Sequence, residues 1–212
     1  MNKNVIFFGN IYINNEESFL RMKDSFNSFN NFLFSEIIIN IRGSFKIKAS
    51  EFLLSKGVSK IYNIESSFGW FHDSYSLLRH SSQEYIFMWL EDFICLKSNE
   101  FEEYINVIIK NKVDIARYTF KQDIIDNFSA KDVIFEDSVS LSINAKQSTF
   151  ADTSVFIISY ASLIKKDLLY KILLSKEKSI WNIKTPFGFE KNSRQIHWLP
   201  LKMSFLKREI IA

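Results

Sequence analysis

Short apolar runs that alternate with segments of helical periodicity are the feature that most restricts how this chain can fold. Residues 5–8, 37–41 and 85–90 consist almost entirely of apolar side chains, and between the first two runs apolar residues recur every three or four positions over residues 15–34. Strands that are apolar on both faces and are joined by helices are typical of a parallel sheet between helical layers. We therefore predict an α/β fold with a mostly parallel central sheet flanked by helices.

The rest of the chain continues this alternation and then becomes less regular. In the first part we predict further strands over residues 58–64 and 114–119 and helices over residues 49–56, 71–80 and 99–110. Later we predict strands over residues 133–136, 138–144, 155–158 and 195–199 and a helix over residues 162–174. Because no linker interrupts the pattern, we predict a single domain, 1–212, with a nucleotide-binding half at about 1–119 and an acceptor-binding half at about 120–212.

Composition excludes several classes of protein. Hydrophobic residues make up 47% and charged residues 24% of the chain, the balance of a soluble globular protein. No stretch without a charge exceeds 12 residues, the length of residues 153–164, whereas a membrane span needs about 20 apolar residues. With no signal peptide evident and with Cys95 as the single cysteine, we predict a cytoplasmic protein. The 27 basic and 24 acidic residues are interleaved, which favours no nucleic-acid partner.

The glycine pattern excludes two common nucleotide-binding motifs. The chain has 5 glycines, and no two stand close enough to form Gly-x-Gly. The dinucleotide-binding fingerprint and the P-loop both need clustered glycines, because the bare backbone must approach phosphates. NAD enzymes of the usual type and P-loop NTPases are therefore excluded, and no Gly-x-Ser-x-Gly motif supports a serine hydrolase.

The ends of the predicted strands carry the first candidate site residues. In a parallel sheet, ligands bind at the carboxyl ends of the strands, which here are Gly9–Asn10, Asn40 to Arg42, and Glu91–Asp92. We interpret Gly9–Asn10 as the turn that ends the first strand. Two carboxylates after a buried strand favour a Mg²⁺ or Mn²⁺ ion, and Asp92 is the preferred ligand because consecutive strand residues point to opposite faces. The alternative is that both carboxylates leave the sheet for solvent and one caps the next helix.

Two further segments combine aromatic and polar residues. Residues 185–191 place Glu190 after a proline and two phenylalanines, which is a way to present a general base; the alternative is an exposed helix glutamate. Residues 67–73 include Trp70 and Asp73 at a predicted helix start, where free N–H groups can hold an anion. The alternative for Trp70 is hydrophobic packing.

These segments together resemble a known family. The alternation from residue 4, the Gly-Trp helix start at residues 69–70 and the sequence Glu-Tyr-Ile-Phe-Met-Trp-Leu-Glu-Asp-Phe at residues 84–93 resemble the nucleotide-sugar half of GT-A-type glycosyltransferases. The strand at residues 155–158, the Lys-Lys-Asp-Leu-Leu sequence at residues 165–169 and the Pro-aromatic-x-x-Glu motif resemble bacterial surface-polysaccharide transferases of this type. The resemblance covers most of residues 4–200.

The resemblance implies roles for the candidate residues. Asp92, with Glu91, matches the motif that holds Mn²⁺ or Mg²⁺ on the diphosphate of the donor, and Glu190 matches the general base. The implied contacts to the nucleoside or diphosphate are Gly9, Asn10, Arg42, Trp70 and Asp73. The family motif is Asp-x-Asp, and this chain departs from it because Ile94 stands where the second aspartate belongs. That departure puts the need for a metal in question, with Arg or Lys as the substitute.

The function implied is transfer of a sugar, with inversion, from a nucleotide-sugar to a glycan or lipid-linked acceptor in bacterial surface polysaccharide synthesis. A non-catalytic GT-A-like binding module in a polysaccharide-assembly complex is the first alternative, and another α/β nucleotide enzyme such as a nucleotidyltransferase is the second. Near the C-terminus, Lys202, Phe205, Lys207 and Arg208 suggest contact with the inner face of a membrane that carries the acceptor; the alternative is a solvated tail.

Overall fold

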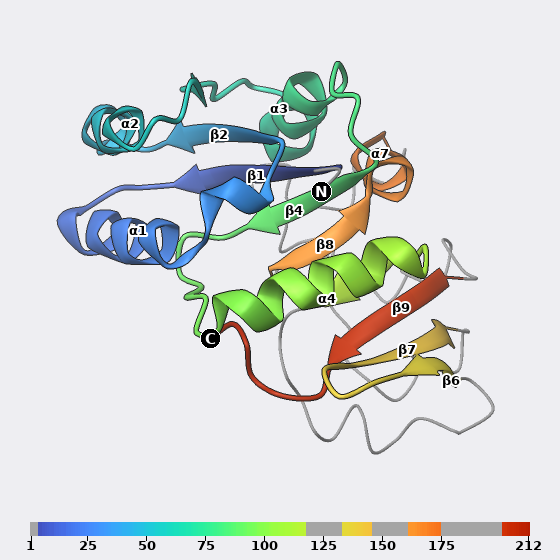
Figure 1. The fold of residues 1–212 in the computed structure, drawn as a ribbon. Coiled ribbons are helices and arrows are strands. Elements are labelled where there is room, and N and C mark those ends of the chain that lie inside the picture. The colour runs from blue at the N-terminus through green and yellow to red at the C-terminus, as the bar shows by residue number, and fades with distance from the viewer. Residues whose placement is uncertain (1–3, 118–132, 146–160, 175–200) are drawn as a thin grey trace.

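The computed structural model describes residues 4–117, 133–145, 161–174 and 201–212, and everything below concerns these residues (Figure 1). The strands are β1 (Val5–Tyr12), β2 (Glu36–Arg42), β3 (Lys60–Tyr62), β4 (Tyr85–Trp89), β5 (Ile115–Arg117), β6 (Val133–Glu136), β7 (Ser140–Ala145), β8 (Ser162–Lys165) and β9 (Leu201–Leu206). The helices are α1 (Glu16–Ser28), the 3₁₀ turn η1 (Asn31–Leu33), α2 (Lys46–Ser55), α3 (Gly69–Leu78), α4 (Ser98–Lys110) and α7 (Lys166–Leu174).

The strands form one sheet in the order β3-β2-β1-β4-β8-β5-β9-β7-β6. The prediction of an α/β fold is confirmed, but the sheet is mixed and not mostly parallel. The strands β1 to β4 pair in parallel, whereas β8 runs antiparallel to both of its neighbours and β7 runs antiparallel to β6 and β9. Strands β5 and β9 also pair in parallel, but β1 to β4 form the larger parallel part, in which neighbouring strands end together at one edge.

Helices cover both faces of the sheet. On one face, α1, α2 and α4 pack against a core rich in phenylalanine, with Phe7 and Phe87 of the sheet against Phe26 of α1 and Phe101 of α4. On the other face, α3 and α7 lie side by side over β1, β4 and β8 (Figure 1). This double cover explains why the strands read as apolar on both faces.

Local sequence signals account for the helix ends. The side chain of Asn15 accepts from the Ser18 N–H and Ser18 caps in return, which begins α1 at Glu16. The predicted helix over residues 15–34 ends early, at Ser28, because Asn30 caps the separate turn η1. Gly57 follows α2 with φ +83°, the left-handed conformation that glycine adopts without strain, as predicted.

The first strand is longer than the sequence predicts. Gly9 and Asn10 do not form a turn, because β1 continues to Tyr12 and pairs with β2 along its length. Gly9 lies in the middle of the sheet, where a Cβ atom would come 2.7 Å from Cε3 of Trp89. The glycine is needed because the indole ring lies directly on the backbone of β1.

The later part of the chain contains the largest error of secondary-structure prediction. The segment over residues 162–174, predicted as one helix, divides into β8 and α7, and β8 is one of the antiparallel strands that make the sheet mixed. Strand β6 is confirmed, β7 begins at Ser140, and β9 was not predicted. The predicted strands over residues 155–158 and 195–199 and the last two residues of the one over 114–119 lie outside the described residues.

One of the four residues predicted to contact a membrane is buried in the structure. Phe205 is 2% exposed in β9, between β5 and β7, and therefore faces the core and not a membrane surface. Lys202 and Arg208 are exposed, and Lys207 pairs with Glu136. No helix within the described ranges is long and apolar enough to cross a bilayer.

Candidate functional site

The carboxyl ends of β1, β2 and β4 meet at one edge of the sheet, called the carboxyl edge below. Tyr12 of β1 is paired with Arg42 of β2, and Gly9 of β1 with Trp89 of β4, so all three strands end within a few residues of one another. The fold therefore brings Arg42 close to the turn after β4, which contains Glu91 and Asp92. Arg42 and the turn after β4 are far apart in the sequence, and they become neighbours only because β2 and β4 both pair in parallel with β1.

A pair of buried asparagines supports one side of this edge. Asn40 donates to Oδ1 of Asn10 (3.0 Å) and to the carbonyl of Ile64 (2.8 Å), and its own Oδ1 accepts from the Ile64 N–H (2.8 Å). Asn10 in turn donates to Oγ of Ser74 at 2.8 Å. The two amides thus join β1 and β2 to the loop between β3 and α3, residues 63–68, which we call the β3–α3 loop.

From the side of α3, Asp73 fixes the same loop and Trp70 joins the helix to β1. The indole N–H of Trp70 donates to the carbonyl of Asn10 (2.9 Å), and Asp73 accepts from the N–H and the hydroxyl of Ser66 (3.1 and 2.5 Å). Both residues are 2% exposed. Trp70 therefore packs against Phe71, which is the hydrophobic packing predicted as the alternative to an anion-binding role. Its indole N–H is used inside the protein, in the bond to β1.

Arg42 is a buried cation at the centre of the carboxyl edge. Its side chain is 8% exposed and lies over the ring of Tyr12, with 5.8 Å from its Cζ to the ring centroid. Burial lowers the pKa of the guanidinium, and the charges of Glu65, Asp73 and Glu91 oppose that shift. Three carboxylates from three different elements thus lie near enough to Arg42 for their charges to stabilise its charged form.

The turn after β4, residues 90–93, is held by α1; we call it the acidic turn. The Phe93 N–H closes it on the carbonyl of Leu90 (3.3 Å). Ser25 of α1 accepts from the indole N–H of Trp89 (2.8 Å) and donates to the Phe93 carbonyl (2.5 Å), while Ser28 accepts from the Cys95 N–H (2.8 Å). Two serines on one face of α1 therefore fix where the carboxylates stand.

Glu91 and Asp92 differ in exposure and share a turn. Burial raises the pKa of the Glu91 carboxyl, Asp92 adds to the rise, and Arg21 and Arg42 act against it. Asp92 is exposed. Because β4 ends at Trp89, the strand alternation that separates consecutive side chains does not apply to these two residues, and both carboxylates are free to approach one cation.

These two carboxylates fit a metal that takes its remaining ligands from a substrate. Among the residues that the structure describes, no group of three or more His, Cys, Asp or Glu side chains could hold a metal ion. Mg²⁺ usually keeps several waters and is bound by one or two carboxylates together with phosphate oxygens. The acidic turn meets that requirement, but it does not form a complete protein cage.

The predicted site residues thus fall into three groups. Arg42, Asp73, Glu91 and Asp92 lie together at the carboxyl edge. Gly9, Asn10 and Trp70 lie beneath it, in the sheet and in α3. The predicted base Glu190 lies outside the described residues.

Three residues at this edge have roles that the sequence did not predict: Asn40, which was placed at a strand end without a role, and Ser25 and Tyr12. Asn40 interrupts a run of isoleucines, and an amide in a strand buried on both faces is a signal of a buried hydrogen-bond network. Ser25 gives no such signal, because a serine among helix residues reads as a surface position.

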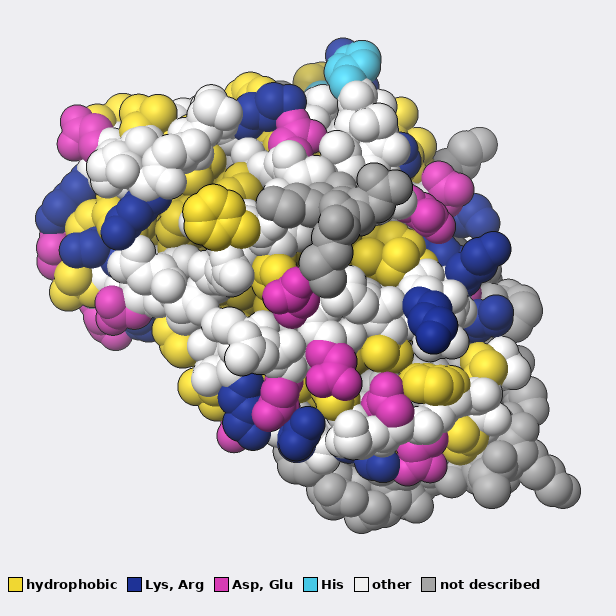
Figure 2. Space-filling view, viewed as in Figure 1, with side chains coloured by type: hydrophobic (Ala, Val, Ile, Leu, Met, Phe, Trp, Pro, Cys, Tyr) yellow, Lys and Arg dark blue, Asp and Glu magenta, His cyan; other side chains and the backbone are white. Residues whose placement is uncertain are grey.

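On the face shown in Figure 2, acidic and basic side chains are intermixed around the molecule and form no single charged stripe.

Comparison with known proteins places the fold. No family model matches the sequence, and no curated protein matches it significantly. S. aureus TarS 1–349 in complex with UDP matches this structure with a TM-score of 0.59 at 12% identity, over 98% of this chain and 59% of that chain. The mannosyltransferase PcManGT from Pyrobaculum calidifontis, in complex with GDP-Man and Mn²⁺, matches with a TM-score of 0.55 at 12% identity, over 94% of this chain and 53% of that chain.

The likeness extends along nearly the whole chain, which has the GT-A-type fold of these glycosyltransferases, as the resemblance in its sequence implied. The chain spans less than two thirds of the length of the proteins that it matches.

Proposed function

We propose that this chain binds a nucleotide-sugar at the carboxyl edge and transfers the sugar to an acceptor. The observation that carries the proposal is that a buried arginine, Arg42, lies within electrostatic reach of Glu91 in the acidic turn, at one edge of a GT-A-type sheet. A cation and an acidic pair side by side suit a diphosphate, because the arginine binds phosphate oxygens directly and the carboxylates bind them through a metal.

Each predicted donor contact receives a role in this proposal. The ring of Tyr12, 49% exposed, offers a surface on which the nucleobase stacks, and Arg42 contacts the ribose or the diphosphate. Asn10, Trp70 and Asp73 act through the β3–α3 loop, whose exposed residues face the donor. Gly9 acts by letting Trp89 lie against β1.

Glu91 and Asp92 would hold the divalent cation, Mn²⁺ or Mg²⁺. The PcManGT structure contains Mn²⁺ together with GDP-Man. A bound cation neutralises negative charge on the departing diphosphate. The carboxylates have to be ionised to bind it, so the burial of Glu91 makes Asp92 the better ligand.

The acceptor side of the proposal rests on the sequence. Glu190 takes the proton of an acceptor hydroxyl, a role worth about 10²–10⁴-fold in rate, and with no carboxylate nucleophile the reaction inverts the anomeric centre. Residues 1–119 form the donor half and residues 120–212 the acceptor half. The acceptor is a glycan or a lipid-linked glycan in bacterial surface polysaccharide synthesis, reached from the cytoplasmic face of the membrane.

The test is a thermal-shift panel of UDP-, GDP-, CMP- and dTDP-sugars, each with and without Mn²⁺, on the native chain and on Asp92→Asn. Donor at a hundredfold excess over Kd adds about 2.7 kcal/mol, or about 5–10 °C in Tm. We expect one donor class to produce this shift, with a Mn²⁺-dependent part that Asp92→Asn removes. Asp167→Asn, at an exposed aspartate of α7, is the matched control and should respond like the native chain.

A shift that ignores Mn²⁺ would retain the donor site and remove the metal from it. Absence of a shift with every donor, alone and with candidate acceptor glycans added, would contradict the proposal.

One observation favours the alternative of a non-catalytic module. Ile94 occupies the place of the second aspartate, and its backbone pairs with Ala212 in both directions, at 2.6 and 3.0 Å. These two hydrogen bonds give residue 94 a structural role in place of the metal-binding role of the second aspartate. A module of this kind would show no Mn²⁺-dependent binding of a nucleotide-sugar and no release of nucleoside diphosphate, which the thermal-shift panel and a coupled assay distinguish.

A further inference from the structure

The chain that follows β9, residues 207–212, runs from the end of that strand to the start of α4 (Figure 1). We call it the return segment, because it comes back to the residues that follow the acidic turn. Its last three residues pair in antiparallel fashion with residues 94–96. Three backbone hydrogen bonds join the two segments: from the Ile94 N–H to the Ala212 carbonyl (2.6 Å), from the Ala212 N–H to the Ile94 carbonyl (3.0 Å) and from the Leu96 N–H to the Ile210 carbonyl (2.8 Å).

Residues 94–96 are held on both of their sides. In an extended chain successive N–H groups point in opposite directions, so the N–H groups of Ile94 and Leu96 face the return segment and that of Cys95 faces away from it. There the Cys95 N–H donates to Ser28 of α1 at 2.8 Å. Because β4 fixes the chain up to Trp89, the acidic turn spans the gap between two fixed ends.

The side chains of this pairing belong to the core beneath the end of β4. Cys95 and Ile211 lie opposite each other and are 7% and 1% exposed, and Ile210 is fully buried. All three belong to the same hydrophobic cluster as Trp89. Because a protein interior is close-packed, the return segment cannot shift without displacing this core.

The other end of the return segment is fixed to different elements. The Lys207 N–H donates to the Val139 carbonyl between β6 and β7 (2.9 Å), and its ammonium group pairs with Glu136 of β6 (2.6 Å). Arg208 pairs with Glu100 of α4 (2.8 Å). The return segment therefore connects the residues after the acidic turn with the hairpin at the far side of the sheet.

We propose that the return segment is a positioning segment for the cation of the donor site. By pairing with residues 94–96 it fixes the end of the acidic turn, and with it the places of Glu91 and Asp92. Loosening the pairing then weakens cation binding and leaves the nucleotide contacts of the β3–α3 loop unchanged. This inference rests on the proposed function, because the cation is the one that binds together with the diphosphate.

The test removes one hydrogen bond of the pairing. Ala212→Pro deletes the N–H that donates to Ile94, at an exposed position, and proline favours the extended backbone that the pairing already gives Ile211. Ala212→Gly keeps the N–H and is the matched control. MnCl₂ is titrated into each variant with UDP, GDP, CMP or dTDP present, and Tm is followed.

We expect the Mn²⁺ concentration at half-maximal stabilisation, the Mn²⁺ midpoint, to rise about threefold to tenfold in Ala212→Pro, the range that one hydrogen bond is worth. Ala212→Gly should match the native chain, and nucleotide binding without Mn²⁺ should be the same in all three proteins. With no ligand present, amide hydrogen exchange at residues 91–93 should be faster in Ala212→Pro than in Ala212→Gly.

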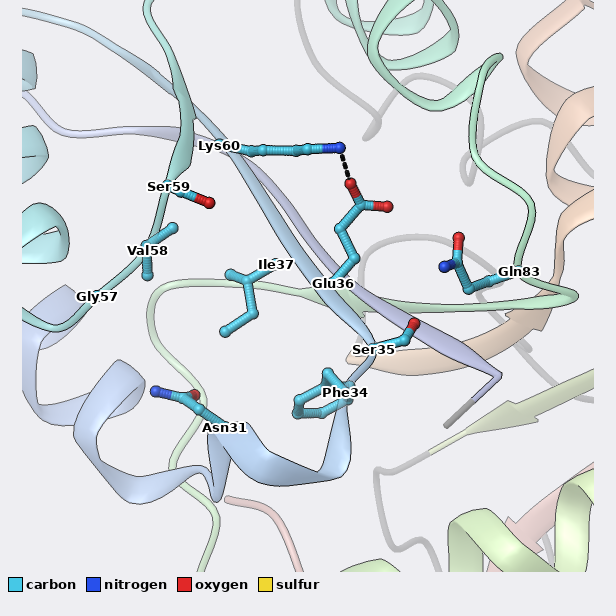
Figure 3. Close-up of a pocket in the computed structure, with 10 residues that line it drawn as sticks. All are labelled: Asn31, Phe34, Ser35, Glu36, Ile37, Gly57, Val58, Ser59, Lys60 and Gln83. Atoms are coloured by element: carbon cyan, nitrogen blue, oxygen red, sulfur yellow. Dashed lines mark hydrogen bonds and ion pairs between the residues drawn. The ribbon is translucent and has the colours of Figure 1, made fainter. Parts of the chain in front are cut away.

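The pocket in Figure 3 provides a second control, at the opposite edge of the same strands. An ion pair between Lys60 and Glu36 lies along it, and none of the residues drawn there belongs to the acidic turn or to the return segment. Glu36 begins β2, whereas Arg42 ends the same strand about 20 Å away. Lys60→Gln removes this ion pair and should leave the Mn²⁺ midpoint unchanged.

A disulfide tests the pairing in the opposite direction. Cys95 is the single cysteine of the chain, and it exchanges no hydrogen bonds with Ile211 across the pair. Opposite residues of this kind have Cα atoms about 4.5 Å apart, which a disulfide can span. In Ala212→Pro combined with Ile211→Cys, oxidation should restore the native Mn²⁺ midpoint and reduction should raise it again. The single variant Ile211→Cys, compared oxidised and reduced, gives the same comparison without the proline.

The outcomes separate this inference from the proposed function. Equal Mn²⁺ midpoints in Ala212→Pro and Ala212→Gly would overturn the inference and retain the cation site. A rise that oxidation of the double variant does not reverse, or an equal loss of nucleotide binding with and without Mn²⁺, would overturn it as well. A native chain that gains no stability from Mn²⁺ with any of the four nucleotides would contradict the cation site and the inference together.

Discussion

The two loops that border Arg42 are held by different parts of the molecule. The β3–α3 loop is tied to the sheet by the amide of Asn40 and to α3 by the carboxylate of Asp73. The acidic turn is tied to α1 by the hydroxyl of Ser25. One loop therefore depends on buried side chains of the sheet and α3, and the other depends on serine hydroxyls of α1, of which Ser25 alone contacts the turn itself.

This difference means that the two loops can be disturbed separately. In the proposed function the β3–α3 loop serves the nucleotide and the acidic turn serves the cation. Variants of Asn40 should then act mainly on stability and donor binding, and variants of Ser25 mainly on the response to the cation.

The largest effect is expected for Asn40→Leu. Asn40 is fully buried, and leucine of similar size leaves the Ile64 N–H and C=O and the Asn10 oxygen without their partner. We expect the free energy of unfolding in urea to fall by about 2–4 kcal/mol, since each unpaired buried group costs about 1–3 kcal/mol. Where the variant is folded, it should also lose donor affinity.

Asn63→Leu is the matched control, because Asn63 is exposed in the same loop and donates to Ser50 and to the carbonyl of Tyr62. Its unfolding free energy should change by about 0.5 kcal/mol or less. Equal losses in the two variants would show that the Asn40 network does not support the loop.

A smaller and more selective effect is expected for Ser25→Ala. The change removes the partner of the Trp89 indole and of the Phe93 carbonyl, at a cost of about 1–2 kcal/mol. Because the acidic turn loses its anchor, the Mn²⁺ concentration at half-maximal stabilisation by donor should rise about threefold to tenfold, whereas donor binding without Mn²⁺ should stay the same. Thermal-shift titrations measure both quantities.

The control for that variant is Ser55→Ala, which removes one serine bond to a backbone carbonyl from the exposed end of α2. It should leave the Mn²⁺ response unaltered. If Ser25→Ala reduced donor binding equally with and without Mn²⁺, the two loops would not be independent.

The smallest effect, with the opposite sign, is expected for Glu91→Gln. The pKa of Glu91 is higher in the folded chain because of burial, so between the ordinary glutamate pKa and the raised one the folded state binds more protons than the unfolded state. Stability therefore falls as the pH rises through that window, and the neutral glutamine avoids the loss. We expect Glu91→Gln to raise Tm by about 1–3 °C at pH 7 while weakening the Mn²⁺ response.

The gain should shrink as the pH is lowered toward the ordinary glutamate pKa of about 4.3, which a Tm series against pH follows. Glu103→Gln, at an exposed position of α4, should show no such dependence. A destabilised Glu91→Gln at neutral pH would mean that attraction to Arg21 and Arg42 outweighs the burial of the carboxylate.

The sequence predicted the parallel part of the fold well because local patterns there agree with tertiary structure. The apolar runs that became β1, β2 and β4 are each buried on both faces, and the phenylalanine stripe of α1 faces the core as its spacing indicated. The same reasoning failed at residues 162–174, because Leu163 and Ile164 fit a helical stripe as well as a strand. Only pairing with β4 and β5 makes them β8.

The sequence alone determined that this chain is α/β, that it lacks glycine-rich phosphate loops, and that Glu91 and Asp92 follow a buried strand. These properties depend on residue type and local spacing. The tertiary structure decided that Arg42 stands beside those carboxylates, that Gly9 lies under an indole ring, and that Ser25 holds the acidic turn. Each of these brings together residues that are more than 40 positions apart, and only strand pairing and helix packing can do so.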